Sequence, residues 1–162
     1  MFTDGSKIRL MQKVRRVLGA PEPALQCAVL PWRRGKKGVE IMLITSRGTG
    51  RWVLPKGWPE KGETLCQAAE REAGEEAGIK GSAVNEPIGQ NYYDKDLGNG
   101  FSKRCEVRVF AMQVKDMIKH WPEKDVRNRI WVSPNTASTM VAEPDLAELL
   151  ANFRGKPKKT AA

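Results

Sequence analysis

The segment from Gly57 to Ile79 constrains the fold of this chain more than any other part of its sequence. Thr64 and Gln67 have the spacing of a capping box, which predicts that a helix begins at Thr64. Gly78 suits the left-handed residue that follows the end of a helix. The segment therefore predicts a loop that leaves a strand, followed by one helix over residues 64–78.

The predicted helix carries acidic residues beside an apolar stripe, and the stripe comprises Leu65, Cys66, Ala69, Ala73 and Ala77. Glu72, Glu75 and Glu76 fall along its edge at i, i+3 and i+4 spacing. Like charges at these spacings repel, and partial burial makes ionisation costlier. Oxygen ligands of this kind suit Mg²⁺ or Mn²⁺. The alternative from the residues alone is a solvated acidic helix face.

The order of the fixed residues in this segment resembles the signature of the Nudix hydrolases. The matching positions are Gly57, Glu63, Arg71, Glu72, the apolar Ala73, Glu75, Glu76, Gly78 and Ile79. The one departure is the small size of Ala73, where the family often has a larger aliphatic residue. The resemblance implies an α/β fold, an α/β/α sandwich with a mixed β-sheet that carries the loop and helix. It also implies hydrolysis of a pyrophosphate bond by water with a divalent metal ion.

The resemblance assigns roles to the residues of the signature. Glu72, Glu75, Glu76 and the backbone carbonyl of Gly57 would hold the metal, Mg²⁺ or Mn²⁺. Glu63 would add an outer ligand or orient the site.

Arg71 is the expected structural partner, because it lies one turn before Glu75 and can reach back to Glu63. Glu75 is the first candidate for the general base. A base from a distant loop is the alternative, with Glu123 and Glu143 as candidates.

The substrate class follows from the residues before the signature. Residues 51–58, RWVLPKGW, resemble the branch that contains the diphosphoinositol polyphosphate phosphohydrolases. That branch implies a phosphorylated small molecule, a diphosphoinositol polyphosphate or a diadenosine polyphosphate. Lys56 and Trp58 flank a single Gly57, where a glycine triplet is expected in the best-known eukaryotic members. The alternatives are an RNA 5′-end pyrophosphohydrolase, a nucleoside triphosphate or nucleotide-sugar pyrophosphatase, and a non-catalytic ligand-binding module.

A polyphosphate substrate requires cations near the helix, and the resemblance indicates Arg47, Arg51, Lys56, Lys103 and Arg104. Exposed basic residues are common in loops and at strand ends, so a surface role is the alternative for each. Arginine is the better bidentate phosphate partner. Trp52 and Trp58 are candidates for stacking on an adenine ring, and Trp52 is equally a candidate for the core.

The charge of this 162-residue chain is concentrated at its ends, although its formal net charge is +9. We divide it into a basic N-terminal arm (1–19), one domain (20–153) and a basic tail (154–162) that is expected to be disordered. The domain itself is almost neutral. Basic tails attract polyanions without specificity, so a nucleic-acid partner is an alternative that is not favoured.

Apolar and turn-forming residues predict the remaining elements. We expect a hairpin of strands at 25–32 and 39–45, a short strand at 52–54, one or two strands within 83–93, and strands at 103–114 and 130–132. Helices are expected at 134–141 and from Glu143 to Phe153, and residues 7–19 have the pattern of a basic amphipathic helix.

The remaining sequence features concern compartment and partners. The cysteines Cys27, Cys66 and Cys105 are odd in number and lack zinc-site spacing, and the sequence shows no signal peptide or apolar membrane span. These features favour a reduced, cytoplasmic setting. His120 has no partner motif and is expected at the surface. The sequence leaves the oligomeric state open.

Overall fold

Two long strands that run side by side organise the sheet. In the computed structural model, which describes residues 4–155, β1 (Ala24–Gly35) pairs in parallel with β7 (Phe101–Met117). The register runs from Ala24 opposite Cys105 to Trp32 opposite Gln113. Most of the β1 side chains from Gln26 to Trp32 are buried, as expected for a central strand covered on both faces.

The other strands extend this central pair into one mixed sheet of eight strands within the described residues. On the β1 side, β2 pairs with β1, and β3 and β8 pair with β2; the short β4 also pairs with β1. On the β7 side, β6 and β5 pair with different parts of β7. The bounds of these strands are β2 (Gly38–Thr45), β3 (Trp52–Val53), β4 (Lys56–Gly57), β5 (Ile79–Ala83), β6 (Gly89–Gly98) and β8 (Arg129–Val132).

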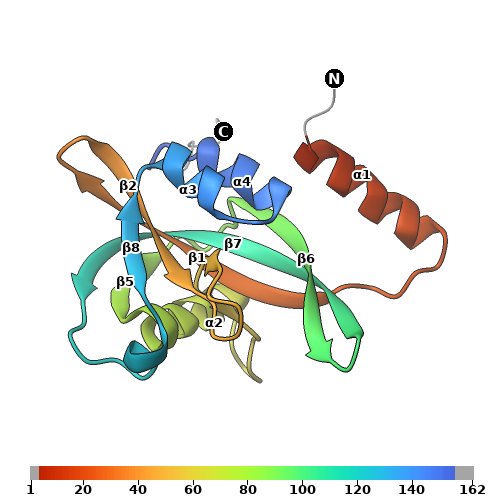
Figure 1. Cartoon of the computed structure of the whole chain (residues 1–162), viewed down its shortest axis with the longest axis horizontal. Helices are drawn as coiled ribbons and strands as arrows, with labels where there is room; N and C mark the ends of the chain where they lie inside the picture. The colour runs from red at the N-terminus through yellow and green to blue at the C-terminus, as the bar shows by residue number, and fades with distance from the viewer. Residues whose placement is uncertain (1–3, 156–162) are drawn as a thin grey trace.

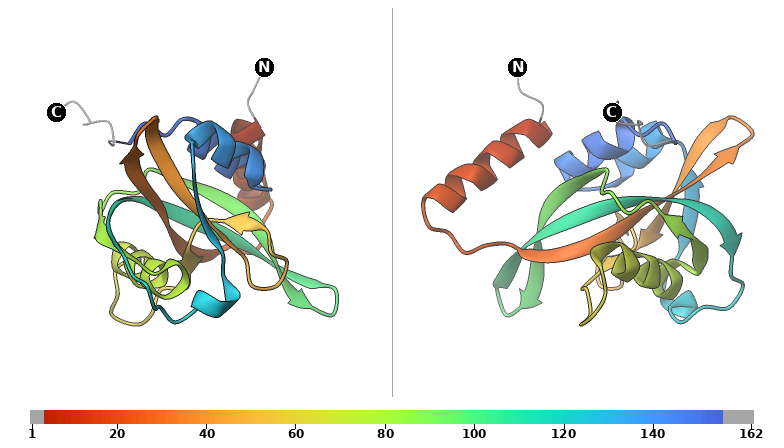
Figure 2. Two further views of the ribbon diagram at one scale, coloured as in Figure 1. Left: turned by 60° about the vertical axis from the view of Figure 1, so that its left-hand side comes forward. Right: turned by 180° about the vertical axis from the view of Figure 1, so that it is seen from behind.

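Helices cover both faces of the sheet (Figure 1). The α2 helix (Leu65–Glu72) and the π-helical turn η1 (Ala73–Ala77) lie on one face, and α3 (Pro134–Met140) and α4 (Pro144–Ala151) lie on the other. Figure 2 shows the helices on the two faces of the sheet in two further views. Each face has its own apolar cluster, because strand side chains alternate between faces. The predicted α/β/α sandwich is confirmed.

The signature helix differs from its predicted form after Glu72. The α-helical part ends there, and the chain makes a π-helical turn over Ala73–Ala77 before Gly78 adopts a left-handed conformation, with φ 62°. A π-helical turn changes the angular spacing of side chains, so the three carboxylates do not form the regular i, i+3, i+4 edge. Gly78 must remain small as well, since a Cβ atom there would overlap the Trp121 ring.

Most predicted strands are present, with shifted bounds. The turn predicted over residues 33–38 is shorter, because the hairpin closes with Gly35 opposite Gly38. The strands expected within 83–93 are separated by a bend at 84–88, so β5 ends at Ala83 and β6 starts at Gly89. Both strands pair with β7, so the backbone N–H and C=O groups of β5 and β6 that face β7 have hydrogen-bond partners.

The N-terminal helix α1 (Asp4–Val17) lies beside α4 (Figure 1). Its Gly5 N–H donates to the Glu148 carboxylate at 3.1 Å. Several apolar side chains of α1 remain exposed, among them Leu10, Val14 and Val17. Of the tail 154–162 that is expected to be disordered, residues 156–162 lie outside the described residues. Its first two residues have defined contacts instead: Arg154 donates to the Ala151 carbonyl at 2.7 Å, and Gly155 is buried. Within residues 4–155 no helix is long and apolar enough to cross a membrane. The short 3-10 turn η2 (Lys124–Val126) precedes β8.

Candidate active site

A capping box starts the signature helix at the position predicted from the sequence. The Thr64 side chain accepts a hydrogen bond from the Gln67 backbone N–H at 3.1 Å. The Gln67 side chain accepts one from the Thr64 N–H at 2.9 Å. These bonds satisfy two backbone donors at the helix start and fix the direction in which the loop enters α2.

Arg71 ties this loop to the helix, as the sequence predicted. Its Nε donates to Oε1 of Glu63 at 2.8 Å, and its Nη2 donates to the carbonyl of Trp58 at 3.0 Å. Its Nη1 contacts Oε1 of Glu72 at 2.9 Å and Oε1 of Glu75 at 3.5 Å. The guanidinium lowers the pKa of the Glu63 carboxyl by hydrogen bonding and charge. Arg71 therefore acts within the protein as a brace between loop and helix.

Gly57 is buried directly against Glu72. A Cβ atom at Gly57 would overlap the Glu72 carboxylate, so only glycine allows this approach. The Gly57 backbone pairs with Cys27 of β1, whose thiol donates to the Gly57 carbonyl at 3.5 Å. Burial and the nearby Glu72 charge raise the pKa of the Cys27 thiol to about 11. Cys27 is thus neutral at physiological pH and is available as a weak donor.

Glu76 is withdrawn from water and held by two groups. Its Oε1 lies 2.6 Å from Nη2 of Arg127, and its Oε2 accepts from the Lys56 N–H at 3.0 Å. Burial raises the pKa of Glu76 to about 7, although Arg127 and Lys56 oppose the shift. Sequence reasoning missed Arg127. It lies far from the signature, in the stretch before β8, and no residue spacing links it to Glu76.

The three carboxylates assigned to metal binding differ in exposure. The side chains of Glu72 and Glu76 are 15% and 13% exposed, whereas that of Glu75 is 48% exposed. The structure therefore brings Glu72 and Glu76 to the buried edge of the sheet and leaves Glu75 toward solvent. The three carboxylates that were predicted to lie along one edge thus differ in exposure, and Glu75 and Glu76 belong to the π-helical turn.

The alternative base candidates occupy different surroundings. Glu123 accepts from Arg127 at 2.9 Å and from Arg47 at 3.2 Å, and its backbone N–H donates to the Glu75 carbonyl at 3.2 Å. It therefore lies beside the signature helix.

Glu143 accepts from Arg51 at 3.0 Å, while its Oε2 is buried without a hydrogen-bond partner among residues 4–155. That orphaned oxygen lines a small hollow together with Lys56 and Tyr93. A buried acceptor of this kind requires a donor, which a bound ligand or water can supply.

The five cations assigned to substrate do not form one cluster. Burial lowers the pKa of Lys56, whose ammonium lies 5.2 Å from the Tyr93 ring centre. Arg47 and Arg51 pair with Glu123 and Glu143, as described above.

Lys103 and its strand partner Lys95 lie 5.6 Å and 5.5 Å from the Trp58 ring centre, respectively. Arg104 is separated from Lys103 by strand alternation and lies near Tyr92 instead, 5.6 Å from its ring centre. The structure does not bring Arg104 to the other four cations. Trp58 is 38% exposed, whereas Trp52 packs against the core, and His120 is at the surface as expected.

The fit of the site to a metal ion rests on the chemistry of its donors. Among residues 4–155, no three acidic, histidine or cysteine side chains converge on one point. Glu72 forms an ion pair with Arg71, and Glu76 forms one with Arg127. Yet both carboxylates are partly buried with raised pKa values, and the missing Cβ of Gly57 leaves room for oxygen donors beside it. Carboxylate oxygens are hard ligands that suit a divalent cation, and such a cation would offset the cost of ionising them in a partly buried site.

Comparisons with known proteins agree with this geometry. A sequence profile of the NUDIX domain matches residues 24–153. The chain is 36% identical over 108 residues to Nudix hydrolase 13, mitochondrial, of Arabidopsis thaliana, covering 61% of this chain and 52% of that protein. It is 28% identical over 98 residues to diphosphoinositol polyphosphate phosphohydrolase 3-alpha of Mus musculus, covering 60% and 56%. The chain thus spans about half the length of the curated relatives it matches.

The fold also matches solved structures. The crystal structure of C. elegans Ap4A hydrolase superposes with a TM-score of 0.62 at 19% sequence identity, covering 80% of this chain and 95% of that one. At this identity the match establishes the common fold. It does not transfer the activity of that enzyme.

Proposed function

This chain belongs to the NUDIX family, and from that premise we propose that it hydrolyses a phosphoanhydride bond in an oligophosphate small molecule with a divalent metal ion. The observation that carries the proposal is that two partly buried carboxylates with raised pKa values, Glu72 and Glu76, lie on the helical segment braced by Arg71, with Gly57 directly against Glu72. Arg71 and Arg127 already pair with these carboxylates, and a divalent cation would add to the stabilisation of their ionised forms.

In the proposed site, Glu72, Glu76 and Glu75 would hold the metal, together with the Gly57 carbonyl. The bound ion would neutralise charge on the phosphate oxygens and lower the pKa of water. Glu63 and Arg71 keep the loop in place around these donors. Arg71 is a positioning residue in this scheme, because its five donors are directed at protein oxygens.

The reaction needs one proton acceptor and an in-line water. Water attacks phosphorus, the bridging P–O bond breaks, and the bond's electron pair leaves with the departing phosphate. Glu75 is the proposed acceptor of the water proton, because its carboxylate is the most exposed of the three. Glu123 is the alternative, since it lies beside the same helix and is held by Arg47 and Arg127.

The substrate proposal rests on Trp58 and its two lysines. Trp58 is exposed next to Gly57, with Lys95 and Lys103 over its ring. An aromatic face beside cations suits a base linked to phosphates, which favours a diadenosine polyphosphate over a diphosphoinositol polyphosphate.

A phosphate-release screen tests both the proposed hydrolytic activity and the proposed substrate. The substrates are diadenosine polyphosphates, diphosphoinositol polyphosphates, nucleoside triphosphates, nucleotide sugars and triphosphorylated RNA, each with Mg²⁺ or Mn²⁺. We expect release from a diadenosine polyphosphate and a KM raised about tenfold in Trp58→Ala, since loss of one stacked base costs on the order of 1–3 kcal/mol. Hydrolysis of RNA alone would contradict the substrate proposal. Ligand binding without any hydrolysis would contradict the enzymatic one and favour a binding module.

A further inference from the structure

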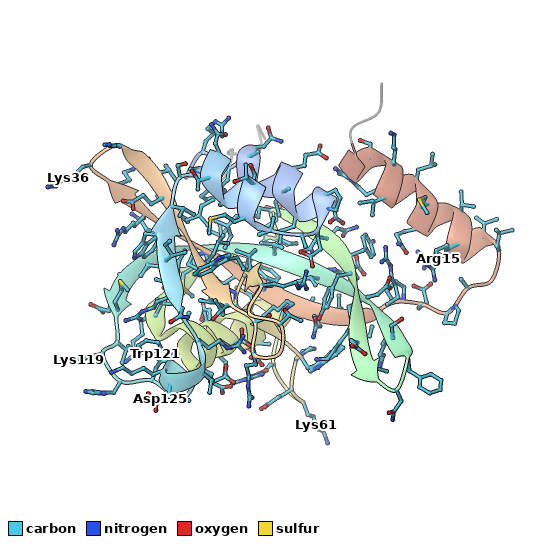
Figure 3. The ribbon with its side chains drawn as sticks, in the orientation of Figure 1. Arg15, Lys36, Lys61, Lys119, Trp121 and Asp125 are labelled. Carbon is cyan, nitrogen blue, oxygen red and sulfur yellow. The ribbon has the colours of Figure 1, made fainter. Side chains whose placement is uncertain are left out.

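A cationic groove lies between α1 and the β6–β7 hairpin, away from the signature helix. It encloses ≈ 390 Å³. Six cationic side chains line it: Arg9, Lys13, Arg15, Arg16, Arg104 and Arg108. Two acidic side chains, Glu22 and Glu106, line it as well. Figure 3 shows Arg15 near the C-terminal end of α1, on the side of the segment that leads into β1.

Two independent elements direct these cations to one place. On α1, Arg9, Lys13 and Arg16 follow one another at i, i+4 and i+7, which places them on one helix face. On β7, Arg104 and Arg108 are separated by an even number of residues and therefore share one face of the strand. The groove is thus a product of the tertiary fold, because α1 and β7 are distant in sequence.

Strand alternation separates this groove from the proposed catalytic site. Lys103 points to the Trp58 side of the hairpin, and Tyr93 on the same side contacts Lys56. Arg104 and Tyr92, whose ring centre lies 5.6 Å from the Arg104 guanidinium carbon, both line the groove. The two faces of one hairpin therefore carry two different sets of cations.

Nearby acids neutralise only part of the charge. Arg16 pairs with Glu22 at 2.9 Å, Arg104 with Asp94 at 3.3 Å, and Arg108 approaches Glu106 at 4.0 Å. Arg9, Lys13 and Arg15 form none of the ion pairs found within residues 4–155. Exposed pairs contribute little energy. The groove therefore retains a positive potential that a polyanion would relieve.

Arg104 is held in place before any ligand arrives. With the Gln12 amide oriented so that its oxygen faces the Arg104 donors, this oxygen accepts a hydrogen bond from Nε of Arg104 at 3.0 Å. The guanidinium carbon of Arg104 lies 5.6 Å from the Tyr92 ring centre, and the Arg104 side chain is 22% exposed. A preordered guanidinium loses less conformational entropy when it binds phosphate.

We propose that this groove is a second binding site, for a compact anion that carries several phosphate groups. Its volume is that of a small-molecule site. Arginine supplies five of its six cations, and arginine binds phosphate oxygens bidentately. A single-stranded nucleic acid is less well matched, since such sites stack successive bases on several aromatic side chains, and Tyr92 is the one aromatic among the described residues that line the groove. The inference does not depend on the proposed hydrolytic activity.

Tripolyphosphate is the probe for this site, and calorimetry measures its binding to the full chain. The buffer holds EDTA and about 0.15 M salt, so divalent metal is absent and weak surface attraction is screened. We expect binding by the native chain and affinity at least about tenfold lower in Arg9→Gln/Lys13→Gln/Arg16→Gln, which loses charge-assisted bonds. We expect a loss in Arg108→Gln too, which leaves α1 unchanged.

The matched control removes the same number of charges elsewhere. Lys36→Gln/Lys37→Gln/Lys119→Gln changes exposed lysines that lie away from the groove, and Figure 3 shows Lys36 and Lys119 at the opposite end of the molecule from α1. The control should bind tripolyphosphate as the native chain does. Equal weakening of control and groove variants, or no binding by the native chain, would overturn the site. If triphosphorylated RNA bound more tightly than tripolyphosphate and lost affinity in the same variants, the proposal that the ligand is a compact anion would be wrong.

Discussion

Glu76 combines the features expected of a carboxylate that acts on a cation. It is 13% exposed, it is held by Arg127 and the Lys56 N–H, and burial raises its pKa to about 7. Arg127 and Lys56 favour its ionised form against the larger effect of burial, and a divalent ion would add to them. At the scale of single residues, substitutions of Glu76 and of its partner Arg127 test the proposed site most directly.

We expect Glu76→Gln to lower kcat about a hundredfold or more, because loss of one preorganised electrostatic group has an effect of this size. The measurement is turnover of the best substrate from the phosphate-release screen at saturating Mg²⁺. Glu86→Gln is the matched control, since Glu86 is exposed in the bend between β5 and β6. Near-native turnover of Glu76→Gln under these conditions would remove Glu76 from the proposed ligand set.

Removal of Arg127 should destabilise the fold. Its side chain is 7% exposed and contacts Glu76 and Glu123, so Arg127→Ala leaves a buried carboxylate without its partner. We expect the free energy of unfolding to fall by about 2 kcal/mol or more, less than the roughly 3–5 kcal/mol typical of a broken buried pair, because Glu76 can take up a proton. Urea unfolding in metal-free buffer measures this change.

Arg47→Ala is the comparison for that experiment, because Arg47 also contacts Glu123 but is 65% exposed. An exposed ion pair is worth less than about 1 kcal/mol. If both variants lost the same stability, the buried Arg127–Glu76 contact would have no special role.

At the scale of elements, the loop and helix of the signature form one unit with two fastenings. The capping box fixes the start of α2, and Arg71 connects the helix back to Glu63 and to the Trp58 carbonyl. The capping box and the contact of Arg71 with Glu63 were predicted from the residues of the segment, whereas the contact of Arg71 with the Trp58 carbonyl was not predicted. The π-helical turn at Ala73–Ala77 was not predicted, since the same residues suit a continuous α-helix.

We expect Thr64→Ala to lower the free energy of unfolding by about 1 kcal/mol, the usual effect of a lost N-cap side chain. Urea unfolding again provides the measurement. Thr139→Ala is a matched control, since Thr139 is exposed and its hydroxyl donates only to the Thr136 carbonyl within α3. A loss in Thr64→Ala no larger than in the control would mean that tertiary contacts, and not the cap, fix the start of α2.

At the scale of the whole molecule, the sheet joins parts of the chain that are distant in sequence. The antiparallel pairing of β1 with β4 places Cys27 opposite Gly57, and the pairing of β8 with β2 brings the preceding Arg127 to Glu76. Metal binding to residues from this assembly should therefore stabilise the entire fold, because the unfolded chain lacks the site.

We expect Mg²⁺ or Mn²⁺ at about a hundred times its Kd to raise Tm by roughly 5–10 °C, as stabilisation of about 2.7 kcal/mol would in a chain of this size. A thermal melt with and without EDTA measures the shift. Glu72→Gln/Glu76→Gln should melt at the same temperature in both buffers, and sodium chloride of equal ionic strength controls for salt. A metal-induced shift retained in the double variant would place the ion elsewhere.

The sequence alone determined the start of the signature helix and the brace between Arg71 and Glu63, and its resemblance to the Nudix hydrolases implied the α/β/α sandwich. The helix start and the brace depend on residues close in the chain, where capping and helical spacing act directly. Only the tertiary structure decided that Arg127 holds Glu76, that Arg104 lies apart from Lys103, and that α1 and β7 form a cationic groove. Such contacts join distant residues, and their partners are set by sheet register and strand alternation, which spacing along the chain does not specify.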